Sequence, residues 1–316
     1  MLFYGILHDI WGCKMDFYIF KDFELLGVLT GFNFINWSRS YNNVGSFEVE
    51  LIFSNEYFEL LNIGNYIYKK DTNETCIILE RYVHTTENGE VILNVKGSNL
   101  NHFLSYRIFS YTGNISLYNF INKIINENFI NPTISNRKVD NFKMKPLSED
   151  LKNINLSLDY KNEEVLKAIS EQLEIVNFGF KMNFLFKEQI FEFEVYEGNK
   201  SSAIFSFEFN NISEQEYYED LKNQKNITIL ENGGYSNNNF KGLERKETAS
   251  EIRKLDKNIE FVIIDSSEQY KYLLDWDLGD IVTTRNSLLN MWFEKNIVGI
   301  EEFTEPTGKY LTVIFN

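Results

Sequence analysis

Short runs of alternating apolar and polar residues dominate residues 17–107. In the clearest run, Ser46 to Leu51, the side chains of Phe47, Val49 and Leu51 share one face of a strand and two glutamates share the other. The pattern predicts seven strands, at residues 17–20, 25–29, 32–37, 46–53, 66–69, 75–83 and 90–96. Because no long helix separates them, we expect a small antiparallel sandwich or barrel.

A turn signal joins the last two of these strands. Asn88-Gly89 lies between two apolar runs, and this dipeptide accepts the positive φ angles that a type I′ hairpin turn requires. We therefore predict a hairpin at this point.

After residue 107, apolar residues recur at steps of three and four, which is the spacing of an amphipathic helix. Asn114 and Ser116 are plausible N-caps for an amphipathic helix that ends before Pro132. A second helix is expected after Asn162, with two glutamates in its first turn, and should end before Gly179. The apolar positions of the two helices are Leu117, Phe120, Ile121, Ile124, Ile125, Phe129, Val165, Leu166, Ile169 and Leu173. Residues 180–186 and 190–196 follow as a β-hairpin.

Strand-like runs return in the last third, at residues 203–209, 226–230, 260–264, 281–284, 297–303 and 310–315. Residues 214–224 fit a helix or a long strand, and we favour the strand. The polar stretch 232–239 is predicted to be a mobile loop. The chain is therefore expected to be mainly β with an α+β insertion. The predicted divisions are a leader or arm at 1–16, a first β domain at 17–110, an α+β insertion at 111–197 and a second β domain at 198–316.

Composition narrows the possible functions. The 316 residues include 31 Lys and Arg against 46 Asp and Glu, which gives a net charge of −15. Such acidity argues against electrostatic nucleic-acid binding and against a polybasic membrane anchor. No stretch approaches the length of an apolar membrane span, so we expect a soluble protein. Cys13 and Cys76 are predicted to be unpaired thiols.

The first residues do not fit a cleaved signal peptide. The apolar start from Met1 to Ile6 is interrupted by Asp9, and no basic segment precedes it. A second methionine, Met15, opens the regular pattern. We expect residues 1–14 to be an extra leader from start-site choice or a short arm.

Motifs that carry chemistry are missing from the sequence. His8, His84 and His102 lie far apart, and the motifs of serine hydrolases, phosphate-binding loops, zinc peptidases and Cys-x-x-Cys sites do not occur. We predict no catalytic residues, no cofactor and no metal site. An acidic glycosidase pair stays open, because its two carboxylates could come from anywhere in the fold.

One acidic cluster and the tryptophans have alternative interpretations. Asp275, Asp277 and Asp280 could offer oxygens to a cation such as Ca²⁺. A turn at Gly279 with the aspartates facing water is the favoured interpretation. Aromatic side chains such as those of the four tryptophans, at positions 11, 37, 276 and 292, could form a sugar-binding platform, although aromatic residues of β proteins more often fill cores.

Taken in order, three sets of segments resemble a known family. They are Tyr41 to Leu51 with 60–67 and 93–107, then 191–198 with 205–211, then 272–282. This ordered set resembles the hub proteins at the tail tip of siphophages and phage-tail-like particles of Gram-positive bacteria. The likeness runs from about residue 17 to the end. The leader has no counterpart in the family, and the chain lacks the long C-terminal extension that many relatives carry.

The resemblance implies a structural protein that forms a homotrimer. Two tail-tube-like β domains per chain would give 3 × 2 = 6 positions, so that a trimer matches a hexameric tail tube. Implied partners are the tail tube or distal tail protein above and a spike, fibre or other tail-tip protein below, with DNA or another payload passing through. The location would be the tail tip of a particle made in the host bacterial cytoplasm. The candidate interface residues are Phe47, Val49, Leu51, Ile281, Val282 and Thr283.

Two other functions stay open. The first is a carbohydrate-binding or cell-wall-degrading tail component, and the second is a monomeric secreted β protein. On the hub interpretation, a trimer carries 3 × −15 = −45 charges, and acidic strand faces would line a channel that repels DNA.

Overall fold

The computed structural model describes residues 17–222, 224–229, 241–248, 256–263 and 269–316. The predicted leader, Cys13 and the loop at 232–239 lie outside these residues. Strands account for 52% of the structure and helices for 19%, which confirms a mainly β protein. Within the described ranges, no helix has both the length and the apolar character needed to cross a membrane.

The first β region forms an antiparallel sheet with the strand order β2-β1-β5-β6-β7-β4-β3. A short helix, α1 (Asn55–Leu60), begins after Ser54, whose hydroxyl accepts a hydrogen bond from the amide of Tyr57. The strands are β1 (Phe17–Lys21), β2 (Glu24–Leu29), β3 (Phe34–Ser40), β4 (Ser46–Ile52), β5 (Tyr66–Lys69), β6 (Glu74–Thr85) and β7 (Val91–Asn99).

The hairpin predicted at Asn88-Gly89 is present, but its turn is longer than expected. Strand β6 ends at Thr85 and β7 begins at Val91, and the amide of Thr86 donates to the carbonyl of Glu90 at 2.8 Å. Gly89 has a φ of 83°, whereas Asn88 is not among the residues with positive φ. A type I′ turn needs positive φ at both positions, so that detail of the prediction is wrong.

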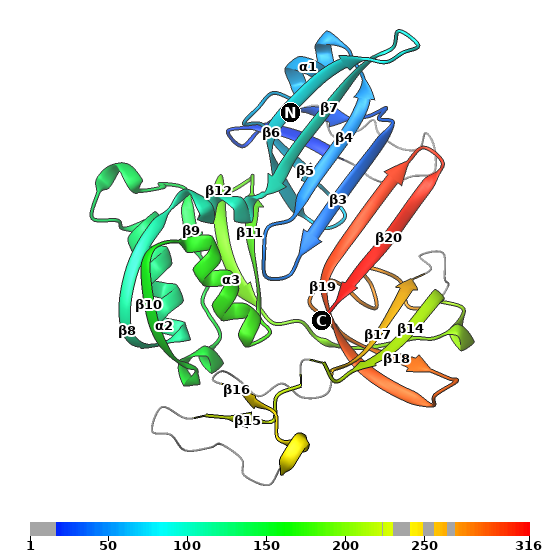
Figure 1. Ribbon diagram of the computed structural model, residues 1–316. Helices are drawn as coiled ribbons and strands as arrows, with labels where there is room; N and C mark the ends of the chain where they lie inside the picture. Colours follow the sequence, from blue (N-terminus) through cyan, green and yellow to red (C-terminus); the bar gives the residue numbers. More distant parts are fainter. Residues whose placement is uncertain (1–16, 223, 230–240, 249–255, 264–268) are drawn as a thin grey trace.

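The two β regions share one sheet (Figure 1). Residues 299–304 of β19 (Met291–Glu305) pair antiparallel with residues 35–40 of β3, on the edge that β4 leaves open. The other half of β19 pairs with β18 (Ile281–Asn286), which also pairs with β13 (Lys200–Phe205). Because β19 occupies the free edge of β3, the first sheet stays open. No sheet of the described residues closes into a barrel, contrary to one of the two expected forms.

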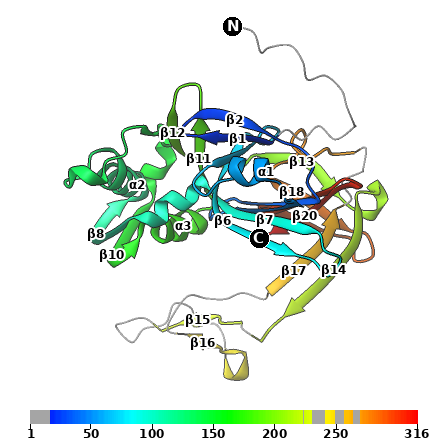
Figure 2. The ribbon, with the colours of Figure 1, turned by 90° about the horizontal axis from the view of Figure 1, so that it is seen from above.

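The middle of the chain is an α+β region that lies to one side of the long sheet (Figures 1 and 2). Its helices are η1 (Leu100–Tyr106), α2 (Leu117–Ile125), η2 (Asn126–Ile130), η3 (Ser135–Arg137), η4 (Glu149–Asn153) and α3 (Val165–Ile175). Its strands are β8 (Ile108–Ser116), β9 (Phe142–Met144), β10 (Asn155–Glu164), β11 (Gly179–Leu185) and β12 (Ile190–Tyr196).

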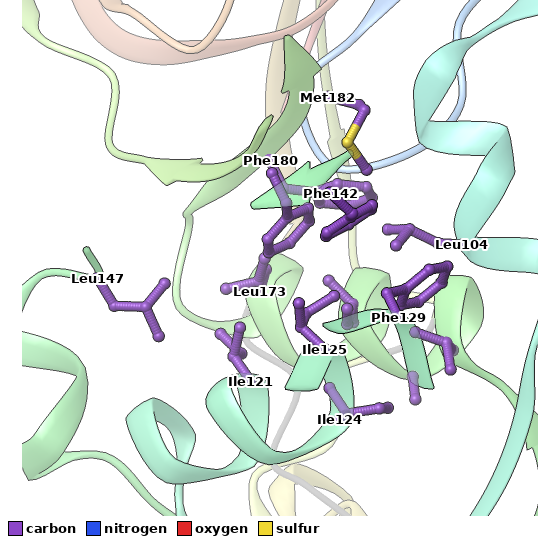
Figure 3. Packing of buried hydrophobic residues seen from close by; sticks show 14 of the residues in the cluster. Leu104, Ile121, Ile124, Ile125, Phe129, Phe142, Leu147, Leu173, Phe180 and Met182 are labelled. Atoms are coloured by element: carbon purple, nitrogen blue, oxygen red, sulfur yellow. The ribbon is translucent and has the colours of Figure 1, made fainter. Parts of the chain in front are cut away.

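Helix α2 forms as its sequence pattern predicts. The hydroxyl of Ser116 caps the helix, and all five apolar positions between 117 and 125 are buried. These side chains pack against α3 and the hairpin β11–β12, with Ile121, Ile125 and Leu173 pointing toward Phe180 (Figure 3). The predicted helix pair and hairpin are thereby confirmed.

The last part of the chain contains η5 (Phe207–Phe209), β14 (Ile212–Asp220), β15 (Ile227–Thr228), η6 (Gly242–Glu244), β16 (Glu247–Thr248), β17 (Asp256–Ile263) and β20 (Gly308–Phe315). Strand β14 pairs with β17, which confirms the choice of strand over helix near residue 214. Strand β20 pairs with β19.

Buried apolar residues form three clusters, and each cluster is centred on one of these parts. Phe20 of β1 belongs to the α+β cluster, and Tyr41 belongs to the cluster of the second β region. The clusters therefore reach across the predicted divisions. The divisions themselves, near residues 110 and 197, stay a prediction.

Candidate functional site

Tyr41, directly after β3, contacts all three parts of the chain. Its amide donates to the carbonyl of Val298 at 3.0 Å, and its carbonyl accepts from the amide of Phe180 at 3.0 Å. Its side chain is fully buried, and the hydroxyl oxygen accepts from the amide of Gly198 at 2.9 Å. The hydroxyl in turn reaches the carbonyl of Asn177 at 3.1 Å. Burial raises the pKa of this phenol, so the group stays neutral.

Glycines make room for the Tyr41 ring. A Cβ atom on Gly179 would lie 2.3 Å from the ring, and one on Gly279 would lie 2.4 Å from it. Gly279 also has a φ of 92°, which side-chain-bearing residues rarely adopt. A Cβ on Gly198 would lie 1.7 Å from the carbonyl oxygen of Gly279. The backbones of Gly179 and Gly279 therefore pack directly against the Tyr41 ring, and the backbone of Gly198 packs against that of Gly279.

Next to this junction lies a network of charged side chains built on three buried ones, Arg39, Lys69 and Glu302. Arg39 lies near the end of β3, at a position whose side chain faces inward, and is 6% exposed. Its Nε donates to Glu74 Oε1 at 2.8 Å, and its Nη1 donates to Asp277 Oδ1 at 2.5 Å and to the Tyr272 hydroxyl at 2.6 Å. Trp37 Nε1 donates to the second oxygen of Glu74 at 3.2 Å. Arg39 thus joins β6 of the first β region to residues 272–277 of the second.

Glu302 of β19 forms the other half of the network and is 1% exposed. Its carboxylate accepts from Lys69 Nζ at 3.1 Å and from the Tyr272 hydroxyl at 2.9 Å, and Lys309 Nζ forms an ion pair with it at 2.5 Å. Lys69 is buried on β5 and also pairs with Asp71 at 2.6 Å. We call the seven residues Arg39, Lys69, Glu74, Tyr272, Asp277, Glu302 and Lys309 the junction network.

The charges of the junction network nearly balance. With Asp71 included, three cations face four carboxylates. Burial alone would raise the pKa of Glu302, but Lys69 and Lys309 outweigh it and hold that pKa below its ordinary value. Burial likewise opposes the charge of Arg39, yet Glu74, Tyr272 and Asp277 raise its pKa further. Both groups are therefore charged at neutral pH, where breaking either pair would strand a buried charge.

The aspartates near Gly279 have structural partners. Asp277 pairs with Arg39, and Asp280 accepts from the amides of Asn199 at 2.8 Å and Asp277 at 2.9 Å. Asp275 accepts from the amide of Lys271 at 2.6 Å. The predicted turn at Gly279 is confirmed, and Asp277 and Asp280, although partly exposed, also bind protein groups. Among the described residues, no group of three or more His, Cys, Asp or Glu could hold a metal ion.

The six candidate interface residues lie on two strands. Phe47, Val49 and Leu51 share one face of β4, as the alternation predicts, and are buried in the core of the first β region. Strand β4 is paired on both edges, with β3 and β7. On β18, Val282 is buried, while Ile281 and Thr283 are half-buried. A contact with another subunit stays a prediction, and on β4 it would have to use the opposite face.

Other singled-out residues have ordinary surroundings. Trp37 and Trp276 are buried, while Trp292 is 53% exposed and lies under the guanidinium of Arg285 at 5.0 Å. Cys76 is a buried free thiol, and burial raises its pKa well above the ordinary value. Apart from Asp277, which was considered only for a cation or a turn, sequence analysis did not single out the residues of the junction network. Arg39 could have been found from the alternation of its strand, because it shares the inward face with Ile35 and Trp37, where a charged residue is unusual.

A family model of Siphovirus ReqiPepy6 Gp37-like proteins matches residues 17–243. The chain belongs to this family. No curated protein sequence matches the chain. The match begins at the first described strand and covers the first β region, the α+β region and part of the second β region. The match therefore includes β3, with Arg39 and Tyr41 beside it, but ends before β19, the strand that pairs with β3.

Solved structures with a similar fold are tail proteins. The prophage tail protein gp18 from Listeria monocytogenes EGD-e is 14% identical, with a TM-score of 0.58 over 95% of this chain and 94% of that one. The 43 kDa tail protein of prophage MuSo2 from Shewanella oneidensis is 9% identical, with a TM-score of 0.58 over 95% and 97%. A tail protein from Neisseria meningitidis MC58 is 10% identical, with a TM-score of 0.58 over 95% and 96%.

These comparisons confirm the family resemblance found in the sequence. At such low identity the solved structures show a shared fold. The family match shows the family of the chain, and the solved structures show that its fold is shared with phage tail proteins. The junction described above is thus the place where the parts of this fold are held together.

Proposed function

We propose that the chain is a hub subunit of a phage tail or phage-tail-like particle, and that three copies form a ring connecting the hexameric tail tube to the tail tip. The observation that carries the proposal is the single sheet that runs from β2 through β3 and β19 to β13. Both β regions contribute strands to it, so each chain offers two neighbouring β units. Three chains supply six such units, which matches a sixfold tube.

A rigid junction supports this role. Two β units can present consecutive positions of a ring only if their relative orientation is fixed. The β3–β19 pairing, the Tyr41 contacts and the junction network fix it by main-chain hydrogen bonds, close packing and buried charge. A flexible linkage would let the relative orientation of the two β units vary, since interfaces between domains of one chain often permit movement.

One face of the shared sheet is acidic and suits a channel wall. In the register of β4, β3 and β19, Glu48 and Glu50 lie on the same face as Glu301 and Glu305. Glu301 is exposed and the other three are half-buried. One counter-charge on this face, Lys96, pairs with Glu48 at 3.1 Å. We propose that this acidic sheet face lines the channel and repels the DNA or other payload that passes.

The proposed role needs no catalysis, in keeping with the tail proteins that share the fold. A neighbouring tail tube or distal tail protein above, and a spike or fibre below, are the proposed partners. Production in the host cytoplasm and delivery to the virion tail tip belong to the same proposal.

The mass of the assembled protein tests the ring. A trimer of a 37.3 kDa chain has a mass of 3 × 37.3 = 111.9 kDa. Multi-angle light scattering at increasing concentration should approach this value. Because a hub ring can need its neighbours to stabilise it, the same measurement is repeated with the tail tube protein of the same particle present. A limiting mass that fits two or four chains in both conditions would contradict the proposal.

A further inference from the structure

Two arginines of the α+β region lie side by side on the surface of this acidic chain. Arg107 follows η1, and Arg137 ends η3 in the loop between α2 and β9. The Nη2 group of Arg107 donates to the carbonyl of Arg137 at 3.3 Å. In the described part of the chain, neither guanidinium is paired with a carboxylate. Lys138, by contrast, pairs with Asp140 at 3.0 Å.

Hydrogen bonds hold both guanidinium groups in place. Arg107 donates to the carbonyls of Asn128 at 3.4 Å and Tyr106 at 3.2 Å, and its charge lies 5.6 Å from the ring of Phe129. Arg137 Nη2 donates to Asn128 Oδ1 at 2.5 Å and to the carbonyl of Ile108 at 3.2 Å. The Nε and Nη1 groups of Arg137 have no acceptor among the described residues. Because Nη2 is already bound to two acceptors, the free Nε and Nη1 groups lie on different edges of the guanidinium, and each can donate a single charge-assisted hydrogen bond to a carboxylate oxygen.

The pair is held together at an electrostatic cost. Burial and the charge of Arg137 lower the pKa of Arg107, and no nearby carboxylate offsets them. Many other cations among the described residues lie beside a carboxylate, as Lys96, Lys123 and Lys145 do, in a chain with 46 acidic and 31 basic residues. An anion supplied from outside would relieve this repulsion.

Three exposed apolar side chains belong to residues whose backbone carbonyls accept hydrogen bonds from the pair. Tyr106 and Ile108, on either side of Arg107, are 50% and 55% exposed, and Ile134, whose carbonyl accepts from the amide of Arg137, is 61% exposed. Large apolar side chains next to a fixed charge are typical of protein contact surfaces. A nucleic acid would bring many phosphates toward a chain of charge −15, and it would gain little from these apolar groups.

We infer that Arg107 and Arg137 form a docking site for a protein segment in which glutamate or aspartate side chains are flanked by apolar residues. A carboxylate would accept from a free donor of Arg137, and the apolar neighbours would cover Tyr106, Ile108 and Ile134. This site lies in the α+β region and does not depend on the proposed ring.

Fluorescence anisotropy with the full chain tests the site. The probe is a fluorescein-labelled peptide with three Glu-Leu-Gly repeats, measured at low and at physiological salt. We expect it to bind, and a peptide with Gln in place of Glu to bind about tenfold more weakly or worse. Arg137→Gln should weaken binding of the Glu peptide about tenfold, while the matched charge change Lys138→Gln should alter it less than about twofold.

A measurement on the wild-type chain makes the test independent of any folding defect in a variant. The Glu peptide should slow modification of Arg107 and Arg137 by phenylglyoxal, followed by mass spectrometry, relative to Arg81 and Arg285. No binding by the wild type, equal effects of the two substitutions, or equal protection of all four arginines would overturn the inference. Stronger competition by a single-stranded oligonucleotide than by the unlabelled peptide would also overturn it, and would identify a phosphate site instead.

Discussion

Replacing Glu302 by Gln tests the junction network most sharply. The substitution keeps the size of the side chain and its ability to accept from Tyr272, but it removes the charge that faces Lys69 and Lys309. The side chain of Lys69 is 2% exposed and keeps only Asp71 as a counter-charge, whereas Lys309 is 22% exposed and can turn toward water. One buried cation is therefore left partly unpaired.

The expected loss follows from that environment. Breaking a buried ion pair by removing one partner costs about 3 to 5 kcal/mol. Because Asp71 stays with Lys69, we expect the lower end, about 3 kcal/mol of the free energy of unfolding. Equilibrium urea unfolding at pH 7, followed by circular dichroism, measures it. The control is Glu301→Gln, one residue away on the exposed face of β19, which should cost less than about 0.5 kcal/mol.

The pH dependence gives a second readout of the same group. The pKa of Glu302 is lower in the folded chain than its ordinary value of 4.5. Its contribution to stability is therefore fully present above about pH 5, and it is lost as the pH falls through the folded pKa. The difference in stability between wild type and Glu302→Gln should shrink toward acid pH. If the two proteins differed by less than about 0.5 kcal/mol at pH 7, the junction network would not stabilise the chain as described.

Two further predictions concern packing. Gly179→Ala places a Cβ against the Tyr41 ring, so we expect the free energy of unfolding to fall by about 2 to 3 kcal/mol. The control is Gly308→Ala, whose Cβ would have its nearest neighbour 3.9 Å away and should change stability little. Thermal unfolding of both variants checks this, and equal midpoints would refute the close contact. Because Cys76 is buried with a raised pKa, a Cys13→Ser chain should not react with Ellman's reagent until it is unfolded in urea, and rapid labelling of the folded chain would contradict that burial.

The sequence predicts those parts of the fold that depend on local patterns. Helix α2 follows from its apolar period and the Ser116 cap, and β4 follows from strict alternation, because these signals act between near neighbours. The pairing of β3 with β19 joins residues about 260 positions apart. Nothing local specifies that register, so an open sheet shared by two β regions was not foreseen and a barrel stayed among the expectations.

The candidate site was harder to predict than the fold. Phe47, Val49 and Leu51 were expected at an interface on the hub resemblance, and all three are buried in the core of the first β region. The junction residues Arg39 and Glu302 look unremarkable in the sequence. They gain their roles from partners on distant strands, which only the assembled sheet brings within 3 Å.

The most direct measurement is an electron cryomicroscopy reconstruction of the particle's tail tip with this chain located in it. The account predicts three copies around the axis, with both β regions of each copy under the tail tube. Glu48, Glu50, Glu301 and Glu305 should face the channel. A different number of copies, or a ring in which this acidic sheet face points away from a neutral or basic channel, would contradict it.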